Sequence, residues 1–263
     1  MKTLLDGLKL PESARWHDGR LWLANWGTGQ ILAVTPDGES EVIATVPTMM
    51  PITFDWLPHG RLLIVDGPNA RLLNADLSTY ADLSPVASLW NELVVDSRGN
   101  AYVNGSSDLQ QPGVIAVVTP DGEVRQVADG ILFGNGMAIT PDEKTLIVAE
   151  SYGNRLTAFD VAEDGSLSGR RVWAELGGDH PDGICLDAEG AVWYADVAKK
   201  HCVRVREGGE VLQKVESDRG CFSCTLGGED GRSLYVLAAE WHGWDNPFGD
   251  GPSGQVQVTG VGH

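Results

Sequence analysis

Basic side chains are scarce in this sequence. Lys and Arg number 19 against 37 Asp and Glu, which gives a formal net charge of −18. A protein that binds nucleic acid needs a basic footprint to neutralise phosphates, and anionic membrane surfaces attract basic segments in the same way. We therefore expect no nucleic-acid partner and no membrane partner.

Long apolar runs and cysteines are also few. No apolar run approaches the length of a membrane span, and Asp6 and Gly7 interrupt the N-terminal residues before a signal-peptide core can form. Four cysteines in 263 residues do not suggest a disulfide framework. Cys221 and Cys224 have redox or zinc spacing, but no second such pair exists, so structural thiols are expected. A reducing cytoplasm is the expected setting.

No segment shows the pattern of an amphipathic helix, whereas turns are abundant, with 33 Gly and 13 Pro. One unit recurs: an apolar stretch, a tight turn, then a short strand such as residues 20–24 or 61–65. The turns end at residues 19, 60, 99, 143, 190 and 231, which lie 39 to 47 residues apart. β-branched and aromatic residues after each turn favour strands.

A second hairpin follows in most units, with Pro-Asp-Gly turns at residues 36–38 and 120–122. Four short strands at this period are typical of a β-propeller, whereas a barrel would lack the four-strand superperiod. We predict an all-β fold: one six-bladed propeller domain of four-stranded blades over residues 1–263. Residues 2–10 are expected to join the last blade and close the ring.

The innermost strand of each blade lines a propeller's channel, so the residues that begin these strands should gather at its rim. Aligning the units on their turns places Glu12, Asn91, Asn135 and Asp182 there, with Ile52 and Ser223 in the other two blades. Carboxylate and amide oxygens suit Ca²⁺ best, with Mg²⁺, Mn²⁺ or Zn²⁺ as alternatives. Such residues can instead satisfy turns and backbone groups, but four at equivalent positions favour a metal site.

Several motifs, in order and in blade register, resemble one family. They are Leu10–Trp16, Pro112-Gly113, Asn135–Asp142, Pro181–Gly190 and Cys224–Gly228. Together they resemble the SMP-30/gluconolactonase/regucalcin-like family, which includes the LRE-like region, and a bacterial-type member of it. The resemblance implies a six-bladed propeller with one divalent metal held by Glu12, Asn135 and Asp182. It also implies that Asn91 contacts the substrate or the metal.

The sequence departs from this family in the third blade. Where the family often reads Arg-x-Asn-Asp-Gly, this chain has Leu89-Trp90-Asn91-Glu92-Leu93. Loss of the basic residue predicts a substrate less polar than a sugar lactone. We expect substrate contacts from Asn91, Trp90, Phe133 and Trp241. The aromatic segment 240–252 is either a lid over the channel or surface packing.

The expected activity is metal-dependent hydrolysis of a lactone, a cyclic ester. The metal would act as a Lewis acid and Asp182 as the general base; no Gly-x-Ser-x-Gly motif supports a serine nucleophile. Alternatives are a metal-dependent esterase or phosphotriesterase, or a propeller that binds a metal or metabolite without turnover. The expected partner is a small-molecule substrate, and the chain is expected to be a monomer or a weak homo-oligomer.

Overall fold

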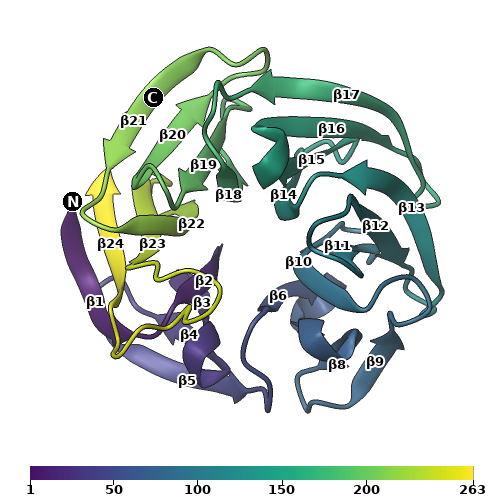
Figure 1. Ribbon diagram of the computed structural model, residues 1–263, viewed down its shortest axis with the longest axis horizontal. Coiled ribbons are helices and arrows are strands. Elements are labelled where there is room, and N and C mark those ends of the chain that lie inside the picture. The colour runs from purple at the N-terminus through teal and green to yellow at the C-terminus, as the bar shows by residue number, and fades with distance from the viewer. Residues whose placement is uncertain (263) are drawn as a thin grey trace. The chain divides into compact units, whose positions relative to one another are not determined.

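The strands of this protein form six four-stranded antiparallel sheets, the blades of a six-bladed β-propeller. The structure is a computed structural model, and it describes residues 1–262. Figure 1 shows the strands of each sheet side by side, for example from β10 to β13. The predicted all-β fold is therefore confirmed.

Contacts divide the chain into two compact units, residues 1–49 with those from 182 onward, and residues 50–181. The first unit holds the sheets β2–β5, β18–β21 and β22–β24 with β1, except for Pro181, the first residue of β18, which belongs to the second unit. Its strands are β1 (Lys2–Leu8), β2 (Pro11–His17), β3 (Arg20–Asn25), β4 (Gln30–Val34), β5 (Ser40–Thr45), β18 (Pro181–Leu186), β19 (Val192–Asp196), β20 (His201–Val205), β21 (Val211–Glu216), β22 (Gly220–Gly227), β23 (Ser233–Ala239) and β24 (Gly254–Gly260).

The second unit holds the sheets β6–β9, β10–β13 and β14–β17. Its strands are β6 (Ile52–Leu57), β7 (Arg61–Asp66), β8 (Arg71–Asn74), β9 (Thr79–Asp82), β10 (Leu89–Val95), β11 (Ala101–Ser106), β12 (Gly113–Val118), β13 (Val124–Ile131), β14 (Gly134–Ile139), β15 (Thr145–Glu150), β16 (Arg155–Val161) and β17 (Leu167–Glu175). Four short 3-10 helices lie between strands: η1 (Trp26–Thr28), η2 (Pro58–Gly60), η3 (Gly67–Asn69) and η4 (Ser151–Gly153). That all six blades fold as one domain stays a prediction.

In the first blade the rim residue Glu12 lies seven residues before Gly19, the end of its turn, one fewer than in the other blades, because its hairpin is tighter. His17 of β2 pairs with Arg20 of β3, so Asp18 and Gly19 alone form the loop. Both have positive φ, 48° and 72°, as two-residue hairpin loops that match the strand twist require. In β10–β11 the last pair is Val95 with Ala101, so the loop is longer.

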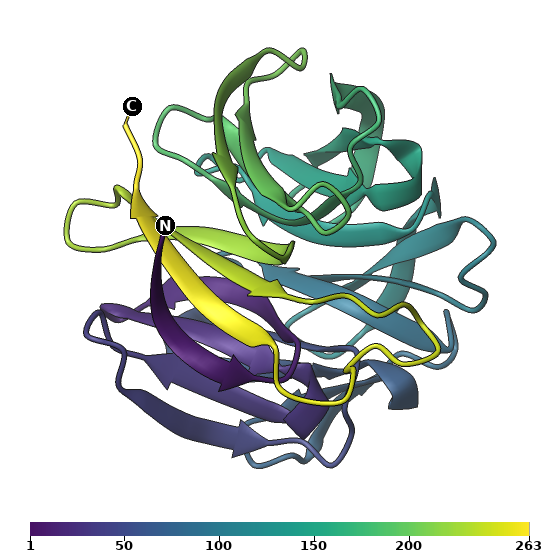
Figure 2. The ribbon, with the colours of Figure 1, turned by 60° about the vertical axis from the view of Figure 1, so that its left-hand side comes forward.

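The N-terminal strand completes the last blade, as predicted. β1 pairs antiparallel with β24, from Lys2 opposite Val258 to Leu8 opposite Gly254, and Figure 2 shows the two strands side by side. Leu8 is buried against a core that includes Tyr235. The strand ends at Leu8, two residues before the expected boundary.

A buried carboxylate fixes the end of β15. Glu150 has no exposed side-chain surface. It accepts hydrogen bonds from the N–H of Leu132 (2.7 Å), from Arg155 and Arg170 (3.1 Å each) and from the hydroxyl of Thr157. Burial would raise the pKa of Glu150, but the bonds from Arg155, Leu132 and Thr157 outweigh it and hold this pKa below 4.5.

Removing residues 1–8 should lower the melting temperature by many degrees. The deletion leaves β24 as an unpaired edge strand and exposes the apolar core beneath Leu8. Thermal unfolding followed by circular dichroism measures the change. An unchanged melting temperature would show that the pairing of β1 with β24 contributes nothing to stability.

The substitution Glu150→Gln should make the free energy of unfolding depend less on pH in the acidic range. A lowered folded-state pKa means that the stabilisation is complete above the unfolded value and is lost as pH falls through the folded value. The variant should therefore lose about 3 kcal/mol at pH 7 and a smaller amount at the acidic end. Urea unfolding at a series of pH values tests this, and a constant difference at every pH contradicts it.

Candidate metal centre

The first strands of four blades are irregular at the predicted rim positions. The register shifts between Glu12 and Arg15 in β2, between Trp90 and Leu93 in β10, between Gly134 and Met137 in β14, and between Cys221 and Ser223 in β22. In β2, β10 and β14 two residues of the bulge face one residue of the neighbouring strand. Bulges redirect side chains and are common beside functional sites.

The blade without a polar rim residue keeps a regular strand. In β6 the pairing with β7 runs unbroken from Ile52 opposite Asp66 to Leu57 opposite Arg61. Ile52 is fully buried. Irregularity therefore accompanies the oxygen-bearing rim residues in these blades, as expected if the bulges serve to aim those side chains.

In the second unit the two rim asparagines contact each other. The amide nitrogen of Asn91 donates to the carbonyl of Gly134 (3.2 Å) and to Oδ1 of Asn135 (3.3 Å). Both side chains are partly buried. These contacts use the amide N–H groups of Asn91, so its oxygen remains the group that can face a ligand.

In the first unit the two rim carboxylates stand on different first strands. Glu12 is 3% exposed, and its Oε2 accepts a hydrogen bond from the N–H of Ser13 (2.7 Å). Asp182 is the second residue of β18 and is partly buried. Its neighbour Gly183 must lack a side chain, because a Cβ there would lie 2.4 Å from Oγ of Ser223.

The donor chemistry fits a hard divalent cation. Two carboxylates balance a 2+ charge, two amides add neutral oxygens, and neither thiol nor imidazole belongs to the set. In a propeller the blades surround a central channel, which is the reason to expect these four residues on one rim. Their convergence on a single ion stays a prediction.

Sequence reasoning missed Glu92. This side chain is 4% exposed, follows Asn91 inside the β10 bulge, and accepts hydrogen bonds from the Thr53 hydroxyl (2.6 Å) and the Leu93 N–H (2.9 Å). Its own N–H donates to Oδ1 of Asn104 (3.3 Å). An acidic residue next to Asn91, between the apolar pairs Leu89-Trp90 and Leu93-Val94, was the available signal.

The predicted substrate contacts fall into two groups. Trp90 has no exposed surface, packs in the core, and donates its indole N–H to the carbonyl of Ala87 (3.0 Å), so packing accounts for its side chain. Phe133 stacks on Tyr152, with ring centroids 4.5 Å apart and Tyr152 55% exposed. Phe133 therefore belongs to an aromatic surface rather than to the core.

Trp241 lies in a second aromatic group, in the first unit. Its ring meets Phe222 edge-on at 5.8 Å and Trp244 at 5.2 Å, and Trp244 is 54% exposed. The segment 240–252 is also anchored to its unit. Lys9 lies over the ring of Phe248 at 5.6 Å. Whether this segment acts as a lid stays a prediction.

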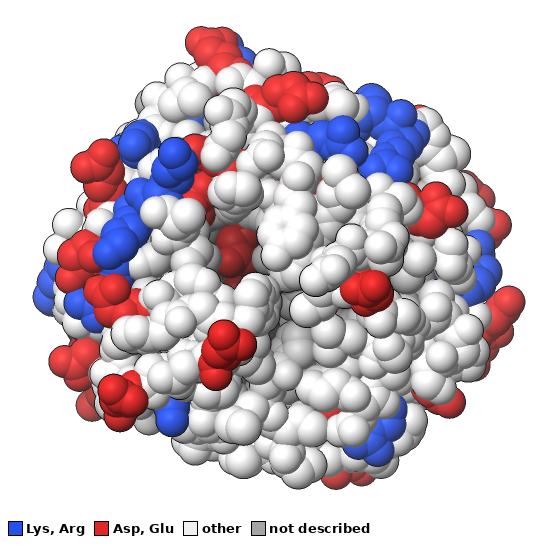
Figure 3. Space-filling view, viewed as in Figure 1, with Lys and Arg blue, Asp and Glu red and all other residues white. Residues whose placement is uncertain are grey.

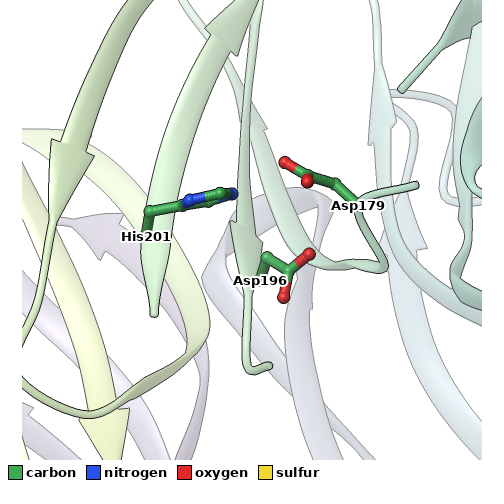
Figure 4. A group of neighbouring side chains, drawn as sticks. All are labelled: Asp179, Asp196 and His201. Carbon is green, nitrogen blue, oxygen red and sulfur yellow. The ribbon is translucent and has the colours of Figure 1, made fainter. Parts of the chain in front are cut away.

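A second group of possible metal ligands, two carboxylates and one imidazole, lies outside the set that the rim alignment selected. Figure 4 shows Asp179, Asp196 and His201, a candidate Asp/His group for a metal ion. Asp196 ends β19 and pairs across the hairpin with His201, which begins β20. Oδ1 of Asp196 accepts a hydrogen bond from the N–H of Lys199 (2.7 Å), so this carboxylate helps to close the turn.

All four cysteines meet in one place in the first unit. Cys202, Cys221 and Cys224 are fully buried in a core cluster, and Cys185 packs against it. The Cys224 sulfur lies within hydrogen-bond reach of the Cys185 and Cys202 thiols. Hydrogen bonding to Cys224 raises the pKa of Cys185, and burial raises that of Cys202, well above 9.0. The structural role expected for Cys221 and Cys224 fits this burial.

Basic side chains gather mainly at the upper left and upper right of the face drawn in Figure 3. Lys and Arg lie there in separate groups, and acidic residues are spread between them. Among residues 1–262, the structure contains no helix with the length and apolar character needed to cross a membrane.

The fold and the donor residues define a six-bladed β-propeller with a candidate oxygen-donor metal centre. The model of the SMP-30/Gluconolactonase/LRE-like region family matches residues 10–240, so the chain belongs to that family. Family membership, inferred above from motifs, is thereby confirmed.

Two relatives illustrate how distant the similarity is. Regucalcin of Xenopus laevis is 31% identical over 163 residues, which are 57% of this chain and 54% of regucalcin. The 6-deoxy-6-sulfogluconolactonase of Pseudomonas putida is 27% identical over 184 residues, 66% of this chain and 62% of that protein. The match therefore spans less than two thirds of either relative.

Solved structures share the fold at lower identity. A luciferin-regenerating enzyme superposes with a TM-score of 0.83 at 18% identity, covering 98% of this chain and 94% of that one. The calcium-binding protein regucalcin of Agrobacterium tumefaciens gives 0.76 at 20% identity, covering 97% and 92%. A gluconolactonase of Xanthomonas campestris gives 0.76 at 20% identity, covering 98% and 89%.

The burial of the cysteines predicts slow thiol chemistry. At neutral pH a thiol reagent should label Cys202, Cys221 and Cys224 only after guanidinium unfolds the chain, because all three side chains are fully buried and the reagent cannot reach their sulfur atoms. Spectroscopic counting of reacted thiols before and after unfolding measures this. Rapid labelling of the native protein would contradict the buried cluster.

Proposed function

We propose that this protein is a metal-dependent hydrolase that opens a lactone. The observation that carries the proposal is the set of oxygen donors Glu12, Asn91, Asn135 and Asp182 on the first strands of four blades. The first three lie at or beside the bulges of β2, β10 and β14. Membership of a family whose relatives include proteins named as gluconolactonases and regucalcins supports it.

The residues fit a calcium ion held by Glu12, Asn135 and Asp182. Their donors are hard oxygens, and the carboxylate of Glu12 is buried and fixed by the N–H of Ser13. When bound, the ion would supply Lewis-acid stabilisation of the negative charge that develops on the ester carbonyl oxygen. We infer Ca²⁺ as the ion because amide and carboxylate oxygens make up the whole set.

A side chain of this protein takes the proton that the attacking water loses. Asp182 accepts a proton from water as the water oxygen attacks the ester carbonyl carbon. The bond between that carbon and the ring oxygen then breaks, and Asp182 returns the proton to the leaving oxygen, which becomes the hydroxyl of the hydroxy acid while the added water oxygen becomes part of its carboxyl group. Asn91 orients the ester, because contacts with Gly134 and Asn135 already occupy its amide N–H groups.

The substrate is proposed to be less polar than a sugar lactone. Leu89 stands where relatives often carry Arg, which removes a partner for sugar hydroxyls. Exposed aromatic side chains in each unit, Tyr152 beside Phe133 and Trp244 beside Trp241, suit an apolar or aryl substituent. These contacts support recognition by packing rather than by hydrogen bonds.

A proton-release assay tests the reaction class. We expect turnover of lactones with apolar substituents, slower turnover of sugar lactones, and loss of both when a chelator removes the metal. Aryl esters and phosphotriesters belong in the same panel. Chelator-sensitive turnover of phosphotriesters alone would replace the proposed substrate, and no turnover of any compound would favour a binding protein.

The substitution Asp182→Asn should lower turnover by about 10²–10⁴-fold, the usual contribution of a general base. Measuring kcat at saturating Ca²⁺ separates loss of the base from loss of the metal. Asp230→Asn is a matched control, because Asp230 is a turn residue of the same unit that accepts a bond from the Arg232 N–H (3.0 Å). Unchanged kcat in Asp182→Asn would remove this residue from the mechanism.

A further inference from the structure

A directed chain of hydrogen bonds runs behind the two rim asparagines of the second unit. The amide nitrogen of Asn91 donates to Oδ1 of Asn135 (3.3 Å), and the amide nitrogen of Asn135 donates to Oγ of Ser151 (3.4 Å). The Ser151 hydroxyl donates to the backbone carbonyl of Pro181 (2.7 Å). The chain thus ends one residue before Asp182 in the sequence.

The last acceptor sets the direction of every bond. A backbone carbonyl can only accept, so the single hydroxyl proton of Ser151 must point at Pro181. Ser151 then has only lone pairs to offer Asn135, which must turn its NH₂ toward Ser151 and its oxygen toward Asn91. The carbonyl of Gly134, which also accepts from Asn91 (3.2 Å), fixes that amide in the same sense.

The backbone around Ser151 is held in place by hydrogen bonds, so its hydroxyl can impose these bond directions. It begins η4, directly after Glu150, and is 7% exposed. Its N–H donates to the carbonyl of Phe133 (3.0 Å), and its carbonyl accepts from Nδ1 of His180 (2.9 Å). With the backbone fixed on both sides, the hydroxyl has one bonding arrangement available.

We propose that Ser151 is a positioning residue that sets the amide orientation of Asn135, in the same sense as the Gly134 carbonyl sets that of Asn91. The proposal rests on the proposed function for its consequence, which is that both amide oxygens stand ready for a cation and an ester. Without the Ser151 hydroxyl, Asn135 can rotate and present its NH₂, which repels a cation. Partners behind metal ligands typically change metal affinity by 10- to 100-fold.

The orientation itself can be measured in the metal-free protein. In NMR spectra the side-chain NH₂ of Asn135, assigned with an Asn135→Asp variant, should exchange slowly with water. Ser151→Ala should abolish that protection, and Ser151→Thr, which keeps the hydroxyl, should retain it. Equal exchange in the parent and Ser151→Ala overturns the proposal, whatever the protein binds.

The consequence is measured by calorimetric titration with Ca²⁺ alone. Ser151→Ala should raise the Kd for Ca²⁺ by about 10- to 100-fold. The Kd of Ser151→Thr should stay within a few-fold of the parent value. Thr157→Val is the matched control: it removes a buried hydroxyl of the same unit that bonds Glu150 and not the asparagines. It should lower the melting temperature and leave the Kd unchanged.

The NMR exchange measurement tests the orientation of the Asn135 amide, and the calorimetric titration tests the proposed metal centre. A parent protein that binds no Ca²⁺ refutes the proposed metal centre, and the exchange rates of Asn135 then decide the orientation by themselves. If the parent binds Ca²⁺ and Ser151→Ala binds it equally well, Ser151 does not position the metal ligands. If Thr157→Val weakens binding as much as Ser151→Ala, the effect is general destabilisation and the assignment fails.

Discussion

The alternation of side chains along a β-strand is the constraint on which this protein's candidate site depends. Successive residues of a regular strand point to opposite faces, so a strand that packs a blade cannot also direct neighbouring side chains to one edge. Bulges in β2, β10 and β14 relax this rule at the starts of the strands, where Glu12, Asn91 and Asn135 lie. The rest of each strand keeps its packing register.

Buried polar groups impose the second condition. A carboxylate or amide out of water must find partners, and those partners fix which atom faces the ligand. The Ser13 N–H fixes Glu12, the Thr53 hydroxyl fixes Glu92, and Gly134 and Asn135 fix Asn91. The amide nitrogens of Asn91 and Asn135 are thereby directed at protein acceptors, so the amide group that each can offer to a hard cation is its oxygen.

Much of the fold could be predicted because the repeat itself encodes it. Turn chemistry at a period of about 40 residues gave the blades, and the short loop Asp18-Gly19 explains why Glu12 lies one residue nearer to the end of its turn than the other rim residues do. The clasp of β1 on β24 followed from a missing fourth strand. The hairpins depend on local sequence, where backbone chemistry acts over a few residues, and the pairing of β1 with β24 follows from counting four strands in every blade.

The details of the site could be predicted only in part. The rim positions followed from alignment, but bulges depend on pairing between strands, so the alignment did not show that Glu92 joins Asn91 in the same bulge. Trp90 looked like a ligand contact beside Asn91, yet it lies in the core. The contact of Asn135 with Ser151 joins residues 16 apart, and no local pattern signals it.

The central claim is that one cation is held by oxygen atoms from separate blades. Crystals soaked in Mn²⁺, which scatters anomalously and accepts the same oxygen donors, test it directly. The account predicts one anomalous peak per chain, coordinated by the carboxylates of Glu12 and Asp182 and the amide oxygen of Asn135. No peak there, or a peak only at Asp196 and His201, would contradict it.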